Sequence, residues 1–217
     1  MSRREEAKAF NRTRICAAAA DIIRNEGIEQ LSMRRLAEQA GVSLRTPYNL
    51  FGSKTEVLIA LLDEVEFELA PLASLRAEGS AITQLLGALS KIETFFARDE
   101  EYHRGIYAAV MSSDHQTARE AGVERAVTTA QALVAQAVAR GELCADTDTP
   151  ALGRHLGIAL LAVLGMWGSG FFANRESIAQ VRRAWLAALL QHAGEQTRLG
   201  LLQSYQQACG SDHADDR

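Results

Sequence analysis

The sequence contains few residues that break helices and no pattern that builds strands. Only three of the 217 residues are proline, and alanine is abundant, which favours helices. We find no long alternation of apolar and polar residues and no Asn-Gly turn between β-branched segments, the usual signs of a β-hairpin. The sequence therefore predicts an all-α fold, with about nine helices from its helical periodicity.

Signs of a metal, cofactor or catalytic site are also lacking. The cysteines, Cys16, Cys144 and Cys209, are odd in number and far apart, unlike a disulfide framework or a zinc site. The five histidines show no metal-ligand spacing, and no Gly-rich phosphate loop or nucleophile motif occurs. We expect no metal, no cofactor and no enzymatic activity, and a helical enzyme is the weakest alternative.

No segment has the pattern of a signal peptide or a long membrane span. The first ten residues carry charges without a following apolar core, so we expect no signal peptide. The most apolar stretch, residues 156–172, is short for a membrane span and predicts a buried helix. A reducing cytoplasm is the expected location, with no membrane partner.

Charge is distributed unevenly along the chain. The formal net charge is −4, yet residues 1–54 hold ten Lys and Arg against six Asp and Glu. The N-terminal part is therefore basic, whereas the remainder is acidic. This asymmetry predicts a polyanionic partner for the N-terminal part alone.

Two short helical segments follow a first helix that we expect over about residues 8–26. Ser32 can cap the first of the two, with Leu31 and Leu36 at the positions of a hydrophobic staple, and Gly41 ends it. The second spans about residues 43–50. A helix, a glycine turn and a second short helix form the helix-turn-helix pattern, whose second helix enters the major groove of DNA.

The second short helix has two possible starts. Ser43 can cap it, which makes Pro47 the fourth helical residue and offers the proline ring to the groove as a rigid apolar surface. Thr46 can cap it instead, which makes Pro47 the first helical residue; we favour the first possibility. We expect a tight or irregular start, because proline disfavours helical angles at the residue before it.

The side chains of this motif divide between a small core and DNA. Arg45 can donate twice to a guanine edge, and Asn49 can pair with adenine. Lys54 follows Ser53 in a capping box with Glu56, at a helix start that favours a phosphate. The expected mini-core comprises Met33, Leu36, Ala40, Val42, Tyr48 and Phe51. The predicted DNA-binding residues are Ser32, Arg34, Ser43, Leu44, Arg45, Thr46, Pro47, Tyr48, Asn49 and Lys54, and further contacts could come from Arg3, Arg4, Arg12 and Arg14.

These residues carry a specific resemblance. The stretches RICAAAADIIRNEGIEQLSMRRLAEQAGVS and TPYNLFGSKTEVL resemble the DNA-binding domain of the TetR (tetracycline-repressor) family over residues 14–58. Leu50 stands where the family often has a histidine, and Pro47 where it often has an aliphatic residue, so the base preference stays open. The residues kept from the family pattern are Ser32, Gly41, Val42, Ser43, Thr46, Tyr48, Phe51 and Lys54.

The rest of the chain predicts a larger helical domain. Thr149 followed by Pro150 fits an N-cap with proline at the first helical position. We assign residues 1–53 to a DNA-binding domain, 54–210 to an effector-binding and dimerisation domain, and 211–217 to a disordered tail. The longer helices are expected near residues 80–97, 101–112, 115–140, 150–173 and 177–207.

The resemblance implies that the last two of these helices pair with their copies in a homodimer. Small residues there would permit close approach and large apolar residues would fill the seam, although packing within the chain is the alternative. Two copies also suit a short reading helix, which contacts few bases. The interface residues predicted in this way are Gly153, Leu156, Gly157, Leu160, Leu164, Trp185 and Leu189.

The resemblance also implies a small molecule held between the middle helices. We expect a mostly apolar ligand, since few charged residues fall there, and its binding would favour one arrangement of the two reading heads. The expected function is a dimeric repressor that this ligand releases from a near-palindromic operator. The alternative is a DNA-binding regulator without an effector, controlled by a protein partner or by its own concentration. Candidate ligand residues are Phe95, Phe96, Tyr102, Tyr107, Met111, His155, Trp167 and Phe171.

Overall fold

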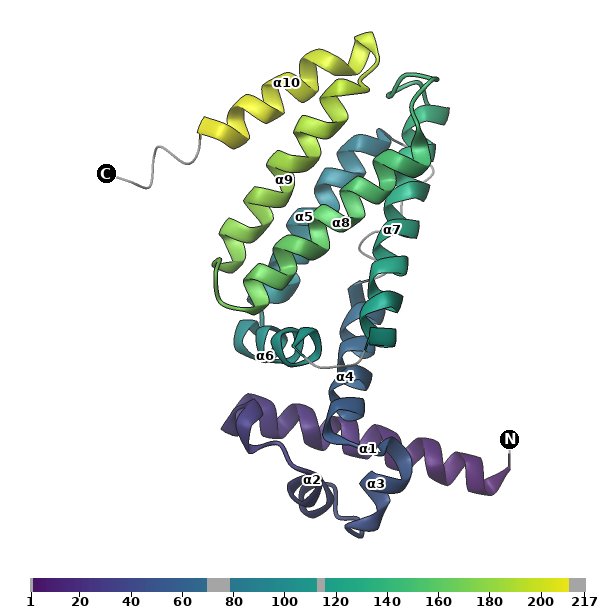
Figure 1. Ribbon diagram of the computed structural model, residues 1–217, viewed down its shortest axis with the longest axis vertical. Coiled ribbons are helices and arrows are strands. Elements are labelled where there is room, and N and C mark those ends of the chain that lie inside the picture. Colours follow the sequence, from purple (N-terminus) through teal and green to yellow (C-terminus); the bar gives the residue numbers. More distant parts are fainter. Residues whose placement is uncertain (1, 70–78, 113–115, 211–217) are drawn as a thin grey trace. The chain divides into compact units, whose positions relative to one another are not determined.

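A computed structural model describes residues 2–69, 79–112 and 116–210. These residues form ten α-helices and one short 3-10 helix, with no strand among them (Figure 1). The predicted all-α fold is confirmed, and the tail expected at residues 211–217 lies outside the described residues. The helices are α1 (Arg3–Glu26), η1 (Ile28–Gln30), α2 (Met33–Gln39), α3 (Arg45–Phe51), α4 (Lys54–Leu69), α5 (Ala81–Ala97), α6 (Glu100–Met111), α7 (Gln116–Ala139), α8 (Thr149–Gly168), α9 (Asn174–Gln191) and α10 (Glu195–Gly210).

The described residues divide into two compact units. Unit 1 comprises those of residues 1–68 and 99–118, and unit 2 comprises those of residues 69–98 and 119–217. Helix α6 therefore belongs with α1 to α4, although α5 precedes it in the sequence. The DNA-binding domain and the effector-binding and dimerisation domain expected from the sequence stay a prediction, because compactness does not test their roles.

Local sequence signals set the ends of α2 in unit 1. Ser32 accepts a hydrogen bond from the N–H three residues on (3.2 Å) and caps α2, as expected. Leu31 and Leu36 are both buried, as a hydrophobic staple requires. After α2, Gly41 adopts φ = 61°, a conformation that glycine adopts without strain.

Helix α1 is longer than the sequence predicted. It begins at Arg3, because Ser2 and Glu5 form a capping box in which each backbone N–H donates to the other side chain. The apolar face of its second half is buried in the core of unit 1. Its buried residues are Ile15, Cys16, Ala18, Ala19, Ala20, Ile22 and Ile23.

Unit 2 has an apolar core to which α5, α7, α8, α9 and α10 contribute. The Trp185 indole N–H donates to the Leu156 carbonyl oxygen (2.9 Å) inside this core, which satisfies a buried polar group. Asp148, and not Thr149, caps α8, because its carboxylate accepts the Ala151 N–H (3.0 Å). The predicted cap was therefore one residue too late.

The single helix predicted over residues 177–207 is wrong, because the chain forms α9 and α10 with a turn between them. Backbone groups of this turn pair with the segment that follows α7. Cys144 N–H donates to the His192 carbonyl (2.8 Å), and Gly194 N–H donates to the Glu142 carbonyl (3.1 Å). The segments approach so closely that a Cβ on Gly194 would lie 2.9 Å from a carbonyl oxygen.

Helix α8 is long and apolar enough to cross a membrane, and 39% of its most apolar window is buried within the chain. A core helix of a soluble protein can have the same length and composition. Leu152, Leu156, Leu164 and Trp167 are buried and give α8 a packing face within unit 2.

Candidate nucleic-acid interface

Helix α3 begins in a way that neither predicted start describes. It runs from Arg45 to Phe51, so Pro47 is its third residue. Proline has no N–H for the Ser43 carbonyl four residues before it, and that carbonyl accepts the Thr46 N–H instead (2.8 Å). The two hydroxyls of Ser43 and Thr46 share a hydrogen bond (2.9 Å). The start is therefore a tight turn, as expected before a proline, without a side-chain cap on the helix N–H groups.

The two sides of α3 differ in exposure. Pro47 and Phe51 lie one helical turn apart, and both are buried. The other side projects into solvent. Its three exposed side chains, together with that of Leu44 directly before α3, form what we call the reading face. The reading face comprises Leu44 (52% exposed), Arg45, Tyr48 (53% exposed) and Asn49.

This packing corrects two predictions. The ring of Pro47 is buried, so it does not offer the groove the apolar surface that we expected. Tyr48 is exposed and therefore does not belong to the mini-core, because its position on the helix is offset by about 100° from Pro47. The other expected mini-core residues are buried or half-buried: Met33, Leu36, Ala40, Val42 and Phe51.

Groups suited to phosphate binding lie at the starts of α2 and α4. Arg34 is exposed and pairs with the glutamate one turn on (3.0 Å), a surface ion pair of little energy that a phosphate can replace. The Lys54 ammonium donates to the Ile28 carbonyl (3.1 Å), and it has three donors in all. As predicted, Ser53 caps α4 by accepting the Glu56 N–H (3.2 Å).

Two arginines of α1 contact the ends of α2 and α3. Arg12 Nη1 donates to the Leu50 carbonyl (2.9 Å), and its guanidinium carbon lies 4.3 Å from the centre of the Phe51 ring. Arg14 donates to the Ala40 carbonyl. The sequence did not predict these contacts within the chain, because periodicity does not reveal which carbonyl a long side chain reaches.

The candidate ligand residues fall in both units. Tyr102, Tyr107 and Met111 belong to unit 1, and the other five belong to unit 2. Phe96 and Trp167 are fully buried, with ring centres 4.7 Å apart, as in an ordinary aromatic core. The role of these residues in ligand binding stays a prediction. Of the other three candidates in unit 2, Phe95 is half-buried, whereas His155 and Phe171 are exposed.

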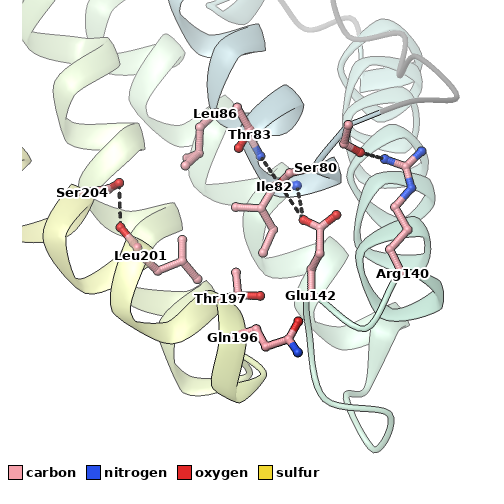
Figure 2. A pocket seen from close by; sticks show the side chains of 12 residues that line it. Ser80, Ile82, Thr83, Leu86, Arg140, Glu142, Gln196, Thr197, Leu201 and Ser204 are labelled. Carbon is pink, nitrogen blue, oxygen red and sulfur yellow. Dashed lines mark hydrogen bonds between the residues drawn. The ribbon is translucent and has the colours of Figure 1, made fainter.

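A cavity of about 550 Å³ lies between the start of α5, residues 140–142 and α10 (Figure 2). The Glu142 carboxylate points at the start of α5 and accepts hydrogen bonds from the Ser80 hydroxyl (2.7 Å) and from the N–H groups of Ala81 (2.6 Å) and Ile82 (2.9 Å). This carboxylate caps α5 from a distant part of the sequence. The Glu142 carboxylate therefore has a structural role, because its hydrogen-bond partners lie within the chain.

A second cavity, of about 500 Å³, lies between α8 and α9, and His155 is on its rim. Small side chains leave this space open between the two helices. On α8, Ile158 (49% exposed) and Met166 (43% exposed) form an apolar stripe along one side, with the exposed Ala162 between them. The cavity is lined by Ala151, Ala184, Ala187 and Ala188, among others.

Six of the seven residues predicted for a seam between two copies are buried within the chain. A Cβ on Gly153 would lie 2.5 Å from the Gln131 Cα of α7, and a Cβ on Gly157 would lie 2.9 Å from the Val127 Cα. These glycines therefore serve the packing of α8 on α7. Leu156, Leu164, Trp185 and Leu189 are buried within the chain as well and Leu160 is half-buried. This burial favours the alternative of packing within the chain for the four buried side chains, and the interface itself stays a prediction.

Residues 15–61 match the sequence model of bacterial regulatory proteins of the tetR family. The fold is similar to a TetR-family transcriptional regulator from Pectobacterium atrosepticum (TM-score 0.70, 18% identity, 89% of this chain and 98% of that one). It is also similar to Thermus thermophilus FadR, a TetR-family transcriptional repressor, in complex with lauroyl-CoA (TM-score 0.64, 20% identity, 82% of this chain and 93% of that one). A third similar structure is SmeT in complex with triclosan (TM-score 0.66, 18% identity, 86% of this chain and 93% of that one). A sequence comparison with curated proteins finds no match.

Proposed function

The chain belongs to the tetR family of bacterial regulatory proteins, and from this premise we propose that it is a homodimeric repressor of transcription acting in the cytoplasm. It binds a near-palindromic operator and leaves it when a small, mostly apolar ligand binds. Double-stranded DNA is its main partner, and the proposal includes no enzymatic step.

The reading face of α3 is the observation that carries this proposal. Arg45 and Asn49 are exposed together with Tyr48 on one side of a short helix. Arginine can donate twice to guanine, and asparagine can donate to and accept from adenine. Pro47 and Phe51 fix the other side in the core, so the reading side chains project from a rigid base.

Phosphate contacts position the reading face in the groove. We assign them to Lys54 at the start of α4 and to Ser32 and Arg34 at the start of α2. Helix starts present backbone N–H groups and a positive dipole end, both of which favour an anion. Such contacts fix the register of a protein on DNA without reading sequence.

The apolar side of α8 and α9 supports dimer formation. The stripe of Ile158, Ala162 and Met166 protrudes next to a cavity lined by alanines. Protruding apolar groups beside a hollow of similar character can complement each other across a two-fold axis, which brings the same patch of both copies together. Dimerisation doubles the number of bases read.

Ligand control is supported by relatives of the same fold. FadR and SmeT were solved with lauroyl-CoA and triclosan, respectively, and both molecules have large apolar parts. In the chain itself, the middle helices carry few charged residues on their buried sides. A regulator without an effector is the second candidate, since Phe96 and Trp167 fill their space by packing on each other.

Selection of bound fragments from random duplex DNA tests the proposal. We expect two copies of one short element related by a two-fold axis, and we expect an apolar metabolite library to release the selected duplex. An unenriched pool contradicts DNA reading. A palindromic duplex that no metabolite releases supports the regulator without an effector.

A further inference from the structure

Arg12 and Arg14 lie two residues apart on α1 and reach two different helices of unit 1. Residues at this spacing point to opposite sides of a helix, so the two guanidinium groups leave α1 in different directions. One contacts the end of α3 at the Leu50 carbonyl, and the other contacts the end of α2 at the Ala40 carbonyl. Both carbonyls belong to the last turn of a helix, where backbone acceptors lack partners within the helix.

Arg12 holds α3 at two points. Its Nη1 donates to the Leu50 carbonyl, and its flat guanidinium lies over the ring of the next residue, Phe51. The buried Pro47 and Phe51 seat one side of α3 in the core of unit 1. Arg12 adds a hydrogen bond and a contact with the face of the Phe51 ring, and these restrict the remaining rotation of α3 about its axis and so refine the direction in which Tyr48 and Asn49 point.

Arg14 holds the turn between α2 and α3. It donates to the Ala40 carbonyl, and a Cβ on Gly41 would lie 3.1 Å from its Nη2. The glycine therefore has two functions: it adopts the positive φ that ends α2, and it leaves room for the guanidinium. The cation also lies at the C-terminal, negative end of the α2 dipole, which is a favourable place for it.

We propose that Arg12 and Arg14 are positioning residues for DNA reading, which set the orientation of α3 from α1 and act through the reading face instead of through a phosphate. This inference rests on the proposed function and deepens it. Helix α1 contributes no side chain to the reading face, yet through Arg12 and Arg14 it becomes a determinant of sequence specificity.

The test compares affinities of the full-length protein and its variants for the selected duplex and for a scrambled duplex of equal length, over a range of salt concentrations. We expect Arg12→Ala to weaken binding to the selected duplex by about tenfold, as expected when a cation–π interaction and a hydrogen bond are removed. Binding to the scrambled duplex should change far less, and the salt dependence should be unchanged. Arg12→Lys should not restore affinity, because an ammonium cannot stack flat and donate in the plane at once.

Arg24→Ala is the matched control. Arg24 also lies on α1, donates to a carboxylate, Asp99 (2.5 Å), and stacks over a ring, Tyr102 (4.1 Å), but it contacts neither α2 nor α3 in these two interactions. Its removal should lower thermal stability and keep the ratio of selected to scrambled affinity. Thermal melting of every variant shows that the protein is folded, and Arg12→Gln, which keeps a donor, replaces Arg12→Ala if the latter does not fold.

Three results would overturn the proposal. The first concerns the slope of the logarithm of affinity against the logarithm of salt concentration. If this slope became shallower by about 0.9 in Arg12→Ala and returned to the wild-type value in Arg12→Lys, Arg12 would bind a phosphate. Equal losses of affinity on both duplexes would identify a purely structural role, and an unchanged affinity would remove any role. If the wild-type protein does not distinguish the two duplexes, the proposed function itself fails, which is a separate outcome.

Discussion

The Lys54 ammonium lies 3.1 Å from the carbonyl oxygen of Ile28 and donates a hydrogen bond to it. This bond ties the start of α4 to η1, which directly precedes α2. Lys54 therefore has a structural contact in addition to the phosphate contact that we propose. The two roles differ in salt dependence, because a phosphate contact releases counterions from DNA and an internal hydrogen bond does not.

Lys54→Ala should weaken operator binding and reduce the salt slope of the affinity by about 0.9 for each phosphate that Lys54 neutralises in the wild-type complex. Titrations at several salt concentrations measure both quantities. Lys91→Ala, at an exposed lysine of α5, is the control and should leave the slope unchanged. Weaker binding with an unchanged slope would mean that Lys54 acts through Ile28 alone.

Tyr48→Ala should weaken binding to the selected duplex by about tenfold without changing the salt slope. The phenol carries no charge, so it releases no counterion. Phe67→Ala on α4 removes another exposed aromatic ring (81% exposed) of unit 1 and should bind as the wild-type protein does. Wild-type affinity in the Tyr48 variant would exclude this side chain from the reading face.

Gly153→Ala should destabilise the protein by about 2 kcal/mol, because the new Cβ would lie 2.5 Å from the α7 backbone. The same substitution at Gly87, which has open space around it within α5, should stabilise the protein by about 0.5–1 kcal/mol through helix propensity. Chemical denaturation measures both changes. Equal effects at the two sites would show that α8 does not pack closely on α7.

Ile158→Arg should convert the dimer to monomers, because it places a charge in the apolar stripe that we propose as the interface. Light scattering at micromolar concentration measures the mass. Val123→Arg, at another exposed apolar position on α7, should stay dimeric. A wild-type protein that is monomeric, or an unaffected Ile158 variant, would rule out this surface.

Cys16 should resist alkylation near pH 9, where a thiol with the ordinary pKa of 9.0 is half ionised, whereas the exposed Cys144 should react. Burial, reinforced by the nearby Glu64 carboxylate, raises the pKa of Cys16 to about 12, so its thiol stays protonated in the folded state. Because this pKa is above the unfolded value of 9.0, the protonated thiol of Cys16 contributes to the free energy of unfolding below about pH 9, and this contribution is lost as the pH rises towards 12. Mass spectrometry after a timed iodoacetamide reaction checks the order, and equal rates would show that Cys16 is accessible.

Local sequence signals predicted the helix-turn-helix well. Ser32, Gly41 and Ser53 act within three or four residues of their own positions, and the structure confirms the helix ends that they predicted. Pro47 was misplaced because its burial depends on what lies under α3. The sequence does not say which side of a two-turn helix faces a neighbouring element.

Contacts between distant segments could not be predicted in this way. The turn between α9 and α10 depends on backbone pairing with residues 142–144, and the cap on α5 comes from Glu142. Gly153 looked suited to a second copy of the chain, since a small residue indicates close approach without naming the partner. The structure identifies that partner as α7.

Selection from random duplex DNA, run in parallel on the wild-type protein and on Asn49→Ala, tests most directly whether the exposed side of α3 reads bases. We predict two symmetry-related elements for the wild-type protein, and a loss of preference at the same position in both elements for the variant. An identical base preference in the two selections, or a change confined to one element, would contradict the account.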